Sequence, residues 1–355
     1  MLPVVQALRR RAGLELILVS TAQHKEMLDQ VFEAFDEAPD LTLEVMRPGQ
    51  DLTDITVRVL EEMRTTIGNL APDLVLVHGD TTTAMASGLA SFYARVPVGH
   101  VEAGLRSHDT SRPWPEEFNR VAIDSYAELL FAPTEIAAAN LRRERPTARG
   151  VFVTGNTGID ALLTIAGRLK GDEVADALDG LDPAAPLVLV TGHRRESFGD
   201  GFARICDGIG RIARRGNVSV VYPVHLNPQV RSVVMDSLGA IDNVRLIDPV
   251  PYPQMVALMQ RAAVILTDSG GIQEEAPALG KPVLVMRDVT ERPEAVETGV
   301  VSLVGTDPGR MDIEVHSLLT DPAYYASRAR KIFPYGDGTA AEKIADAVLD
   351  FLGDK

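Results

Sequence analysis

The chain has 355 residues, 45% hydrophobic and 24% charged, so it can bury a large core, and its length favours two domains over one. Its formal net charge of -15 argues against a nucleic-acid partner, because binding to a phosphate backbone depends on a cationic surface. No apolar run reaches the roughly 18 residues that a membrane-spanning helix needs, and residues 1–16 lack a signal-peptide cleavage pattern. The only cysteine, Cys206, cannot form an internal disulfide and reads as a buried structural thiol, so we expect a cytoplasmic protein with no membrane partner.

Short apolar runs alternate with longer helical patterns, which is typical of βαβ units and of a parallel sheet covered on both faces. In chain order, the first half contains predicted strands at 14–20, 41–45, 74–80, 96–103, 129–133 and 151–156. The second half contains predicted strands at 187–193, 218–225, 244–248, 264–271, 283–286 and 301–305. The expected fold is therefore α/β, with two Rossmann-like, doubly wound parallel sheets of similar size.

The most polar and broken stretch between the two halves is 167–186, so we place the hinge there. The predicted N-terminal domain covers 1–168, and the predicted C-terminal domain covers 169–335. Residues 336–355 are predicted to form a C-terminal helix that packs back on the N-terminal domain.

Candidate site residues follow the apolar runs, because ligands of open parallel sheets bind at the carboxyl ends of the strands. These positions are rich in imidazole, carboxylate and guanidinium groups: HGDTTT (78–83), GHVEAGL (99–105), TGN (154–156), TGHRRES (191–197), YPVHLNP (222–228) and TDSGGIQEE (267–275). A single residue of this kind is more often a helix cap or a solvated loop residue. Six segments together favour one active site in the cleft between the domains.

The segment TDSGGIQEE predicts an anion site. Ser269, Gly270 and Gly271 open a helix whose N–H groups and dipole attract a phosphate, which suggests a nucleotide diphosphate. Glu275, one turn further on, suits ribose hydroxyls, whereas Glu274 is expected to cap the helix or to face solvent. The alternative is a glycine turn followed by acidic residues that favour a first helical turn, and this segment alone does not separate the two.

Several segments together resemble one known family: HGDTTT, GHVEAGLRS, PWPEEFNR, VTGNTGIDAL, TGHRRESFG, YPVHLNP, TDSGGIQEEAPALGKPVLVMRDVTERPEA and PYGDG. They are similar to the non-hydrolysing UDP-N-acetylglucosamine 2-epimerases, bacterial enzymes with a glycosyltransferase-B-like fold. The resemblance runs from about Met1 to the C-terminus, and it is specific because long segments recur in the same order. It implies a homodimer that interconverts UDP-N-acetylglucosamine and UDP-N-acetylmannosamine for surface polysaccharides, without a cofactor or a metal.

The resemblance also implies a mechanism. The C2 proton of the sugar is weakly acidic, so the family is understood to eliminate UDP, giving 2-acetamidoglucal, and then to add UDP back. By resemblance, Asp80, Glu102 and Glu116 supply the acid and base carboxylates, and His193 lies near the phosphates. Which carboxylate takes the C2 proton stays open. From the residues alone, Asp80 could be only a helix cap and Glu116 only a first-turn acid.

Binding residues are implied in the same way. The implied substrate contacts are Ser269, Gly270, Gly271 and Glu275 at phosphate and ribose, Arg292 nearby, and Val250 and Met255 against uracil. Arg292 could instead be a surface cation paired with Glu291 or Glu294. Some relatives bind a second UDP-N-acetylglucosamine as an activator, and Gln23, Arg194 and His225 match that allosteric site, although Glu26 stands where some of those relatives carry glutamine.

The family pattern begins with a strand and a GTRPEAIK-like loop, and this chain starts just after that loop. Such a strand is central in a doubly wound sheet, so its absence is expected to leave 14–20 and 74–80 without a neighbour. We therefore expect lower stability and weaker UDP binding than in a chain extended upstream. The alternative functions are a catalytically impaired nucleotide-sugar-binding protein, a hydrolysing epimerase and a glycosyltransferase of the same fold.

Overall fold

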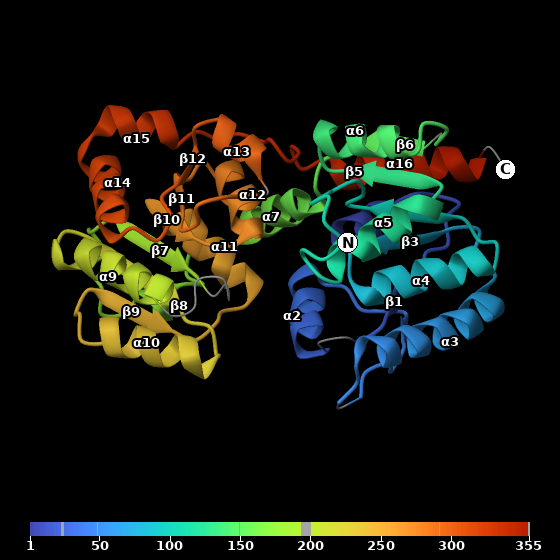
Figure 1. Ribbon diagram of the computed structural model, residues 1–355, viewed down its shortest axis with the longest axis horizontal. Coiled ribbons are helices and arrows are strands. Elements are labelled where there is room, and N and C mark those ends of the chain that lie inside the picture. Colours follow the sequence, from blue (N-terminus) through green and yellow to red (C-terminus); the bar gives the residue numbers. More distant parts are fainter. Residues whose placement is uncertain (23–24, 48, 149, 193–199, 291, 354–355) are drawn as a thin grey trace. The chain divides into compact units, whose positions relative to one another are not determined.

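The computed structural model describes residues 1–22, 25–47, 49–148, 150–192, 200–290 and 292–353 (Figure 1). The chain forms two compact units, the first from Met1–Ala161 with Tyr335–Lys355 and the second from Leu162–Pro334. Every strand pairing in both units is parallel, and helices separate most successive strands. The expected α/β class with parallel sheets is confirmed.

The second unit contains a six-stranded sheet in the order β12-β11-β10-β7-β8-β9. Its strands are β7 (Leu187–Thr191), β8 (Ser219–Pro223), β9 (Val244–Ile247), β10 (Val264–Thr267), β11 (Val283–Val285) and β12 (Val301–Leu303). Its helices are α8 (Ala175–Leu178), α9 (Asp200–Arg214), α10 (Pro228–Leu238), α11 (Tyr252–Arg261), α12 (Gly270–Ala278), α13 (Pro293–Glu297), α14 (Pro308–Thr320) and α15 (Pro322–Arg328). Read from the β9 edge, this is the 3-2-1-4-5-6 strand order of a Rossmann fold. The direction in which successive strands are added to the sheet reverses between β7 and β10.

Helix α9 shows why this sheet is a stable platform. Ile205, Ile209 and Ile212 recur at helical spacing, are almost completely buried, and belong to one core with strand residues such as Val220. Cys206 lies in the same core, and burial raises the pKa of its thiol to about 11. The interpretation of Cys206 as a structural thiol agrees with this position, because a buried thiol is a poor nucleophile.

The first unit contains two sheets, a four-stranded one in the order β3-β4-β5-β6 and a two-stranded one of β1 and β2. The strands are β1 (Val19–Ser20), β2 (Leu41–Thr42), β3 (Val75–His78), β4 (Val98–Val101), β5 (Leu129–Ala132) and β6 (Gly150–Val153). The helices are α1 (Leu2–Arg9), α2 (Lys25–Phe35), α3 (Leu52–Leu70), α4 (Thr82–Tyr93), α5 (Glu116–Tyr126), α6 (Glu135–Glu144), α7 (Thr157–Arg168), which crosses into the second unit, and α16 (Ala340–Gly353).

The expectation of two sheets of similar size is wrong for the first unit. Within the described residues β3 pairs only with β4, and β1 pairs only with β2, so the predicted strand at 14–20 shortens to its last two residues. A strand persists only where its backbone groups have a neighbour. Leu14 and Leu16 instead place their side chains against a core built from α1, α16 and the four-stranded sheet.

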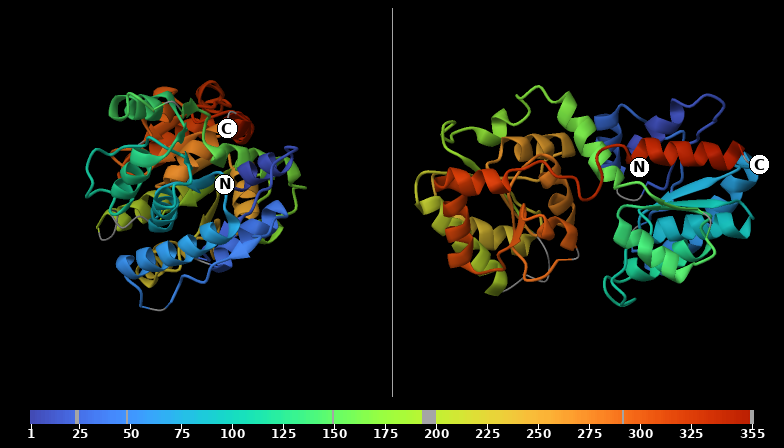
Figure 2. Two further views of the ribbon diagram at one scale, coloured as in Figure 1. Left: turned by 90° about the vertical axis from the view of Figure 1, so that its right-hand side faces the viewer. Right: turned by 90° about the horizontal axis from the view of Figure 1, so that it is seen from above.

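The last helix of the chain belongs to the first unit (Figure 1). Ile344 and Val348 of α16 share a core with Val4 and Leu8 of α1. Figure 2 gives two further views of the chain. At the surface, Arg11 pairs with acidic groups of α16 at 2.8 Å and 2.5 Å. Helix α16 thereby covers one side of the four-stranded sheet. Among the described residues, no helix combines the length and apolarity needed to cross a bilayer.

Candidate functional site

Two of the predicted carboxylate residues, Asp80 and Glu102, lie in the loops that follow neighbouring strands of the first unit. Strands β3 and β4 pair with His78 opposite Val101, so the loops that carry Asp80 and Glu102 emerge side by side at one edge of the sheet. The carboxylate of Glu102 lies against the backbone of the Asp80 loop, since a Cβ added at Gly79 would be 3.4 Å from Glu102 Oε2. Glu102 has φ +70, a left-handed conformation that is costly for a non-glycine residue and is often found at functional sites.

Asp80 is held from helix α5. Its carboxylate pairs with Arg120, whose other terminal nitrogen donates to Glu117 Oε2 at 2.9 Å. Its carbonyl oxygen accepts a hydrogen bond from Asn119 Nδ2 at 2.9 Å. The alternative that Asp80 is a helix cap is wrong, because the hydroxyl of Thr81 accepts from the first turn of α4 at 3.2 Å and caps that helix. The side chain of Asp80 is therefore not needed to cap α4.

Glu116 and Glu117 have different environments. Glu116 is half-buried in the first turn of α5 and, within the described part of the chain, forms no hydrogen bond or ion pair. Glu117 is buried, and its Oε1 accepts from the N–H groups of Ser107 and His108, each at 3.0 Å. Glu117 thus orders the loop after β4, whereas Glu116 fits both its proposed role and the alternative of a first-turn acid. Sequence reasoning missed Glu117, Asn119 and Arg120, although all three lie in the segment PWPEEFNR.

His78 is a further titratable group beside Glu102. Its Nε2 lies 3.6 Å from Glu102 Oε2, and burial is the main cause that lowers the pKa of His78 well below its usual value. The imidazole is therefore neutral at neutral pH, and Glu102 is not neutralised by it.

In the second unit, helix α12 begins where the strand order reverses. The hydroxyls of Thr191 and Thr267, at the ends of β7 and β10, are 2.6 Å apart, and the Ser269 N–H donates to Thr267 Oγ1 at 3.0 Å. Ser269 occupies the N-cap position, but its side chain makes no capping hydrogen bond. The first-turn N–H groups of α12 are thus not capped by Ser269, as an anion-binding helix start requires.

Gly270 and Gly271 differ in how much space the surrounding protein leaves for a side chain. A Cβ at Gly270 would lie 3.1 Å from Cζ of Arg292, so the chain itself favours glycine there. A Cβ at Gly271 would meet only Ser269 Oγ, at 4.0 Å, and Gly271 does not have the positive φ that disfavours side chains. Glycine at 271 is therefore not required by the surrounding protein.

Glu274 is buried, so its expected place as a cap or a solvent-facing residue is wrong. Its Oε1 accepts from Arg292 Nε at 2.8 Å, because a buried carboxylate needs a countercharge. The same pair brings Arg292 to the start of α12, beside Gly270. The loop before Arg292 is fixed by Thr290, whose hydroxyl donates to Gln273 Oε1 at 2.6 Å and accepts from the Arg292 N–H at 3.1 Å.

Glu275 points toward helix α11. The hydroxyl of Tyr252 donates to Glu275 Oε1 at 3.2 Å, and this contact joins the start of α11 to α12. Burial raises the pKa of Glu275 to about 8, and the neighbouring carboxylate of Glu274 contributes in the same direction. Val250, just before α11, and Met255, on it, are both half-buried in this unit.

Comparison with known proteins decides the family. The model of the UDP-N-acetylglucosamine 2-epimerase family matches residues 6–349. The chain belongs to this epimerase family. It is 52% identical to the probable UDP-N-acetylglucosamine 2-epimerase of Ralstonia nicotianae, over 99% of this chain and 96% of that protein. It is also 52% identical to the UDP-N-acetylglucosamine 2-epimerase of Escherichia coli, over 98% of this chain and 94% of that protein.

Solved structures of the epimerase family have the same two-domain, glycosyltransferase-B-like fold. The UDP-GlcNAc 2-epimerase of Neisseria meningitidis, solved with UDP-GlcNAc bound, has a TM-score of 0.90 at 42% identity and covers 99% of this chain and 96% of its own. The enzyme of Methanocaldococcus jannaschii, in complex with UDP-GlcNAc and UDP, has a TM-score of 0.80 at 32% identity, with coverage of 99% and 95%. Sucrose-phosphate synthase of Thermosynechococcus elongatus shares the fold alone, with a TM-score of 0.60 at 15% identity.

Some expected residues of this epimerase-family chain cannot be placed. Gln23, His193 and Arg194 lie outside the described residues. His225 follows β8 and is exposed, and its Nδ1 accepts from the Asn227 N–H at 3.1 Å. Within the described ranges, no group of three or more His, Cys, Asp or Glu side chains could hold a metal ion.

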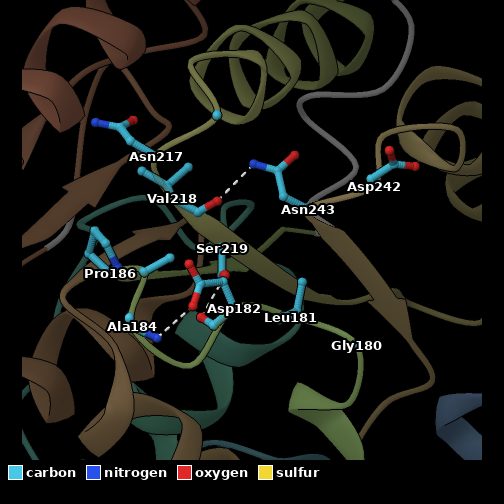
Figure 3. A pocket seen from close by; sticks show the side chains of 12 residues that line it. Gly180, Leu181, Asp182, Ala184, Pro186, Asn217, Val218, Ser219, Asp242 and Asn243 are labelled. Carbon is cyan, nitrogen blue, oxygen red and sulfur yellow. Dashed lines mark hydrogen bonds between the residues drawn. The ribbon is translucent and has the colours of Figure 1, made fainter.

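A cavity of about 480 Å³ lies at the opposite end of the second sheet (Figure 3). Its lining comes from the segments that precede β7, β8 and β9, and includes Asp182, Asn217 and Asn243. Asn243 already donates to the Val218 carbonyl at 2.7 Å, and Asp182 accepts from a backbone N–H at 2.9 Å. The cavity thus lies at the opposite end of the strands from their carboxyl ends, where open parallel α/β sheets bind their ligands.

The raised pKa of Glu275 predicts a dependence of stability on pH. Between the ordinary value of 4.5 and about 8, the folded chain binds more protons at this site than the unfolded chain. The free energy of unfolding should therefore fall as pH rises through this range. Glu275→Gln carries no titrating group, so its melting temperature should rise relative to the wild type from about pH 5 to about pH 8. A constant difference, measured by calorimetry in matched buffers, would contradict the raised pKa.

Proposed function

We propose that the protein interconverts UDP-N-acetylglucosamine and UDP-N-acetylmannosamine at C2, without hydrolysis. The reaction would remove the C2 proton and UDP to give 2-acetamidoglucal, and would then add UDP back at C1 and a proton to the opposite face of C2. The observation that carries this proposal is the pair of loops at the carboxyl edge of β3 and β4, which places the Glu102 carboxylate beside the backbone next to Asp80. Membership of the epimerase family supports it, together with relatives solved with UDP-GlcNAc bound.

In this proposal the first unit supplies proton transfer. Asp80, Glu102 and Glu116 act as acid and base near C2, and the group that is the base in one direction of the reaction is the acid in the other. Arg120 holds the Asp80 carboxylate, and Asn119 holds its backbone. Positioned carboxylates of this kind typically contribute about 10²- to 10⁴-fold each to a rate. No cofactor enters the scheme, since elimination and re-addition transfer only protons and UDP.

The second unit would bind the nucleotide. The N–H groups at Gly270 and Gly271 would donate to the diphosphate, with Arg292 beside them and His193 near the phosphates. Glu275 would accept from ribose hydroxyls, and Val250 and Met255 would pack against uracil. We further propose the domain limits 1–168 and 169–335, with 336–355 as the returning helix, an allosteric role for Gln23, Arg194 and His225, and a cytoplasmic location.

Incubation of UDP-N-acetylglucosamine with the protein in deuterated water tests the proposal. Proton NMR should show a second anomeric signal, from UDP-N-acetylmannosamine, and loss of the C2 proton signal as solvent deuterium replaces it. Release of N-acetylmannosamine and UDP would instead indicate a hydrolysing epimerase, and a requirement for an acceptor would indicate a glycosyltransferase. Binding without deuterium incorporation would indicate a nucleotide-sugar-binding protein.

We also propose a homodimer, with an interface on α4 and α5. Phe92 and Tyr93, at the end of α4, are 51% and 71% exposed, and the Phe92 ring packs on Tyr126 at the end of α5 with ring centroids 5.3 Å apart. Contiguous exposed aromatic groups are typical of protein interfaces. The resemblance to a family of homodimers favours a second copy of the chain as the occupant.

The dimer can be disrupted by one charge. Tyr93→Asp should convert the dimer to a monomer in light scattering, because burying an unpaired charge in an interface costs about 2–5 kcal/mol. Ile313→Asp on α14, which replaces a side chain that is 62% exposed, is the matched control and should leave the mass unchanged. A dimer that persists in the Tyr93 variant at micromolar concentration would refute this interface.

A further inference from the structure

His100 is a completely buried histidine of β4, and acceptors face both of its ring nitrogens. Nδ1 lies 2.6 Å from Asp124 Oδ1, and Nε2 lies 2.9 Å from the carbonyl oxygen of Gly79. A carboxylate and a carbonyl cannot donate, so both contacts are hydrogen bonds only if both ring nitrogens carry a proton.

We propose that His100 is held as a buried imidazolium and that, with Asp124, it positions the two loops that carry Asp80 and Glu102. This role rests on the proposed function for the significance of those carboxylates, but the protonation of His100 can be tested independently. Neither residue of the pair is exposed or placed to touch a substrate, so both are positioning residues.

Asp124 makes the second half of the connection. Its Oδ2 accepts from the Gly104 N–H at 3.1 Å and pairs with Arg106 Nη1 at 2.7 Å. Burial alone would raise the pKa of Asp124, but the hydrogen bonds and charges of His100 and Arg106 outweigh it and lower that pKa. A buried carboxylate between two cations is compensated, and the buried Arg106 is balanced in turn by Glu144 at 3.0 Å.

The His100–Asp124 pair forms a hydrogen bond with the backbone near Asp80 and another with the backbone near Glu102. Gly79, whose carbonyl accepts from His100, directly precedes Asp80, and Gly104, whose N–H donates to Asp124, lies two residues after Glu102. Gly79, Glu102 and Gly104 all have left-handed backbones, with φ +69, +70 and +84. Such conformations persist where surrounding contacts fix them, and the His100–Asp124 pair supplies a contact on each loop.

The other groups around the pair leave its charge balance unchanged. His78, on the neighbouring strand β3, is neutral, and His100 is one of the causes that lower its pKa. Tyr126 of α5 also remains uncharged, since burial raises the pKa of its hydroxyl, with Asp124 adding to the effect. The imidazolium, the Asp124 carboxylate and the Arg106–Glu144 pair therefore form one neutral set, in which Glu144 is the exposed member.

Nitrogen-15 NMR of the wild-type protein tests the charge directly. Both ring nitrogens of His100, assigned by comparison with His100→Gln, should have the chemical shifts of protonated nitrogens at neutral and mildly alkaline pH. One nitrogen at the shift of an unprotonated imidazole would overturn the buried imidazolium. This readout does not depend on any enzymatic activity.

Kinetics of Asp124→Asn test positioning. The amide removes the charge and cannot accept at both oxygen positions, so the loops should shift slightly, and misplacement of reacting groups by about 1 Å can cost about 10²-fold in rate. We expect kcat for epimerisation to fall by that order, with KM within about threefold and UDP affinity unchanged. An unchanged kcat would overturn the role of the pair.

Ile123→Val is the matched control, because Ile123 is fully buried on the same helix and its apolar side chain forms no hydrogen bond with His100 or Asp124. It should lower the melting temperature but keep kcat. If it loses kcat as Asp124→Asn does, the effect is general destabilisation and the positioning role fails. If wild-type protein does not epimerise, the proposed function fails, whereas the NMR result on His100 still stands or falls by itself.

Discussion

Asp80→Asn should lower the rate of epimerisation by about 10²- to 10⁴-fold while UDP still binds, because loss of a positioned acid or base typically costs that much. The substitution keeps the size of the side chain. It also leaves Arg120 with a partner, since Arg120 donates to Glu117 at 2.9 Å, and it leaves the Asn119 contact to the main chain at 2.9 Å. The fold should therefore survive, and the loss should appear in kcat.

Asp109→Asn is a matched control for this experiment. It removes the same charge from the same unit, but Asp109 is exposed and bonds only to nearby groups such as Ser111. Its turnover should stay near that of the wild type, as should the melting temperatures of both variants. Near-normal turnover of Asp80→Asn, measured by NMR on the equilibration of the two UDP-sugars, would remove Asp80 from the mechanism.

The sequence predicts the strands well because their signal is local. In the second unit, six apolar runs correspond to β7 to β12, and the predicted run 264–271 differs mainly in its end, since β10 stops at Thr267. The reason is that Ser269 already occupies the N-cap position of α12, so its segment belongs to the helix start rather than to the strand. Boundaries of this kind depend on hydrogen bonds that apolar periodicity does not encode.

The site residues that sequence reasoning missed act through distant partners. Glu274 looks like a cap or a solvated acid beside its neighbours, whereas its contact with Arg292, 18 residues away, compensates its buried charge. His100 stands in the candidate segment GHVEAGL, yet its partner Asp124 lies 24 residues further on. Local pattern finds the segments that form a site, whereas the pairing of charges inside it is a property of the tertiary fold.

The second large effect is expected at the start of α12. Gly271→Leu should weaken UDP binding by about 10²-fold or more, because the side chain would occupy the space in front of the helix N-terminus. Two hydrogen bonds to a charged phosphate, each worth about 1.5–3 kcal/mol, would then be lost. The protein should still fold, since a Cβ at Gly271 meets no atom nearer than 4.0 Å. Titration calorimetry with UDP measures this loss directly.

Glu275→Ala should weaken UDP binding by up to about 10-fold through the ribose, since the pKa of about 8 leaves Glu275 largely uncharged at neutral pH and a hydrogen bond between uncharged groups contributes about 0.5–1.5 kcal/mol. Tyr252→Phe separates this contact from a structural effect, because it removes the donor at 3.2 Å but keeps the carboxylate. We expect Tyr252→Phe to bind UDP nearly as well as the wild type. If Gly271→Leu and Glu275→Ala both bind UDP normally, α12 is only a structural helix, and the nucleotide must be recognised elsewhere. If only Glu275→Ala binds normally, the phosphate contact stands and the ribose is held by another residue.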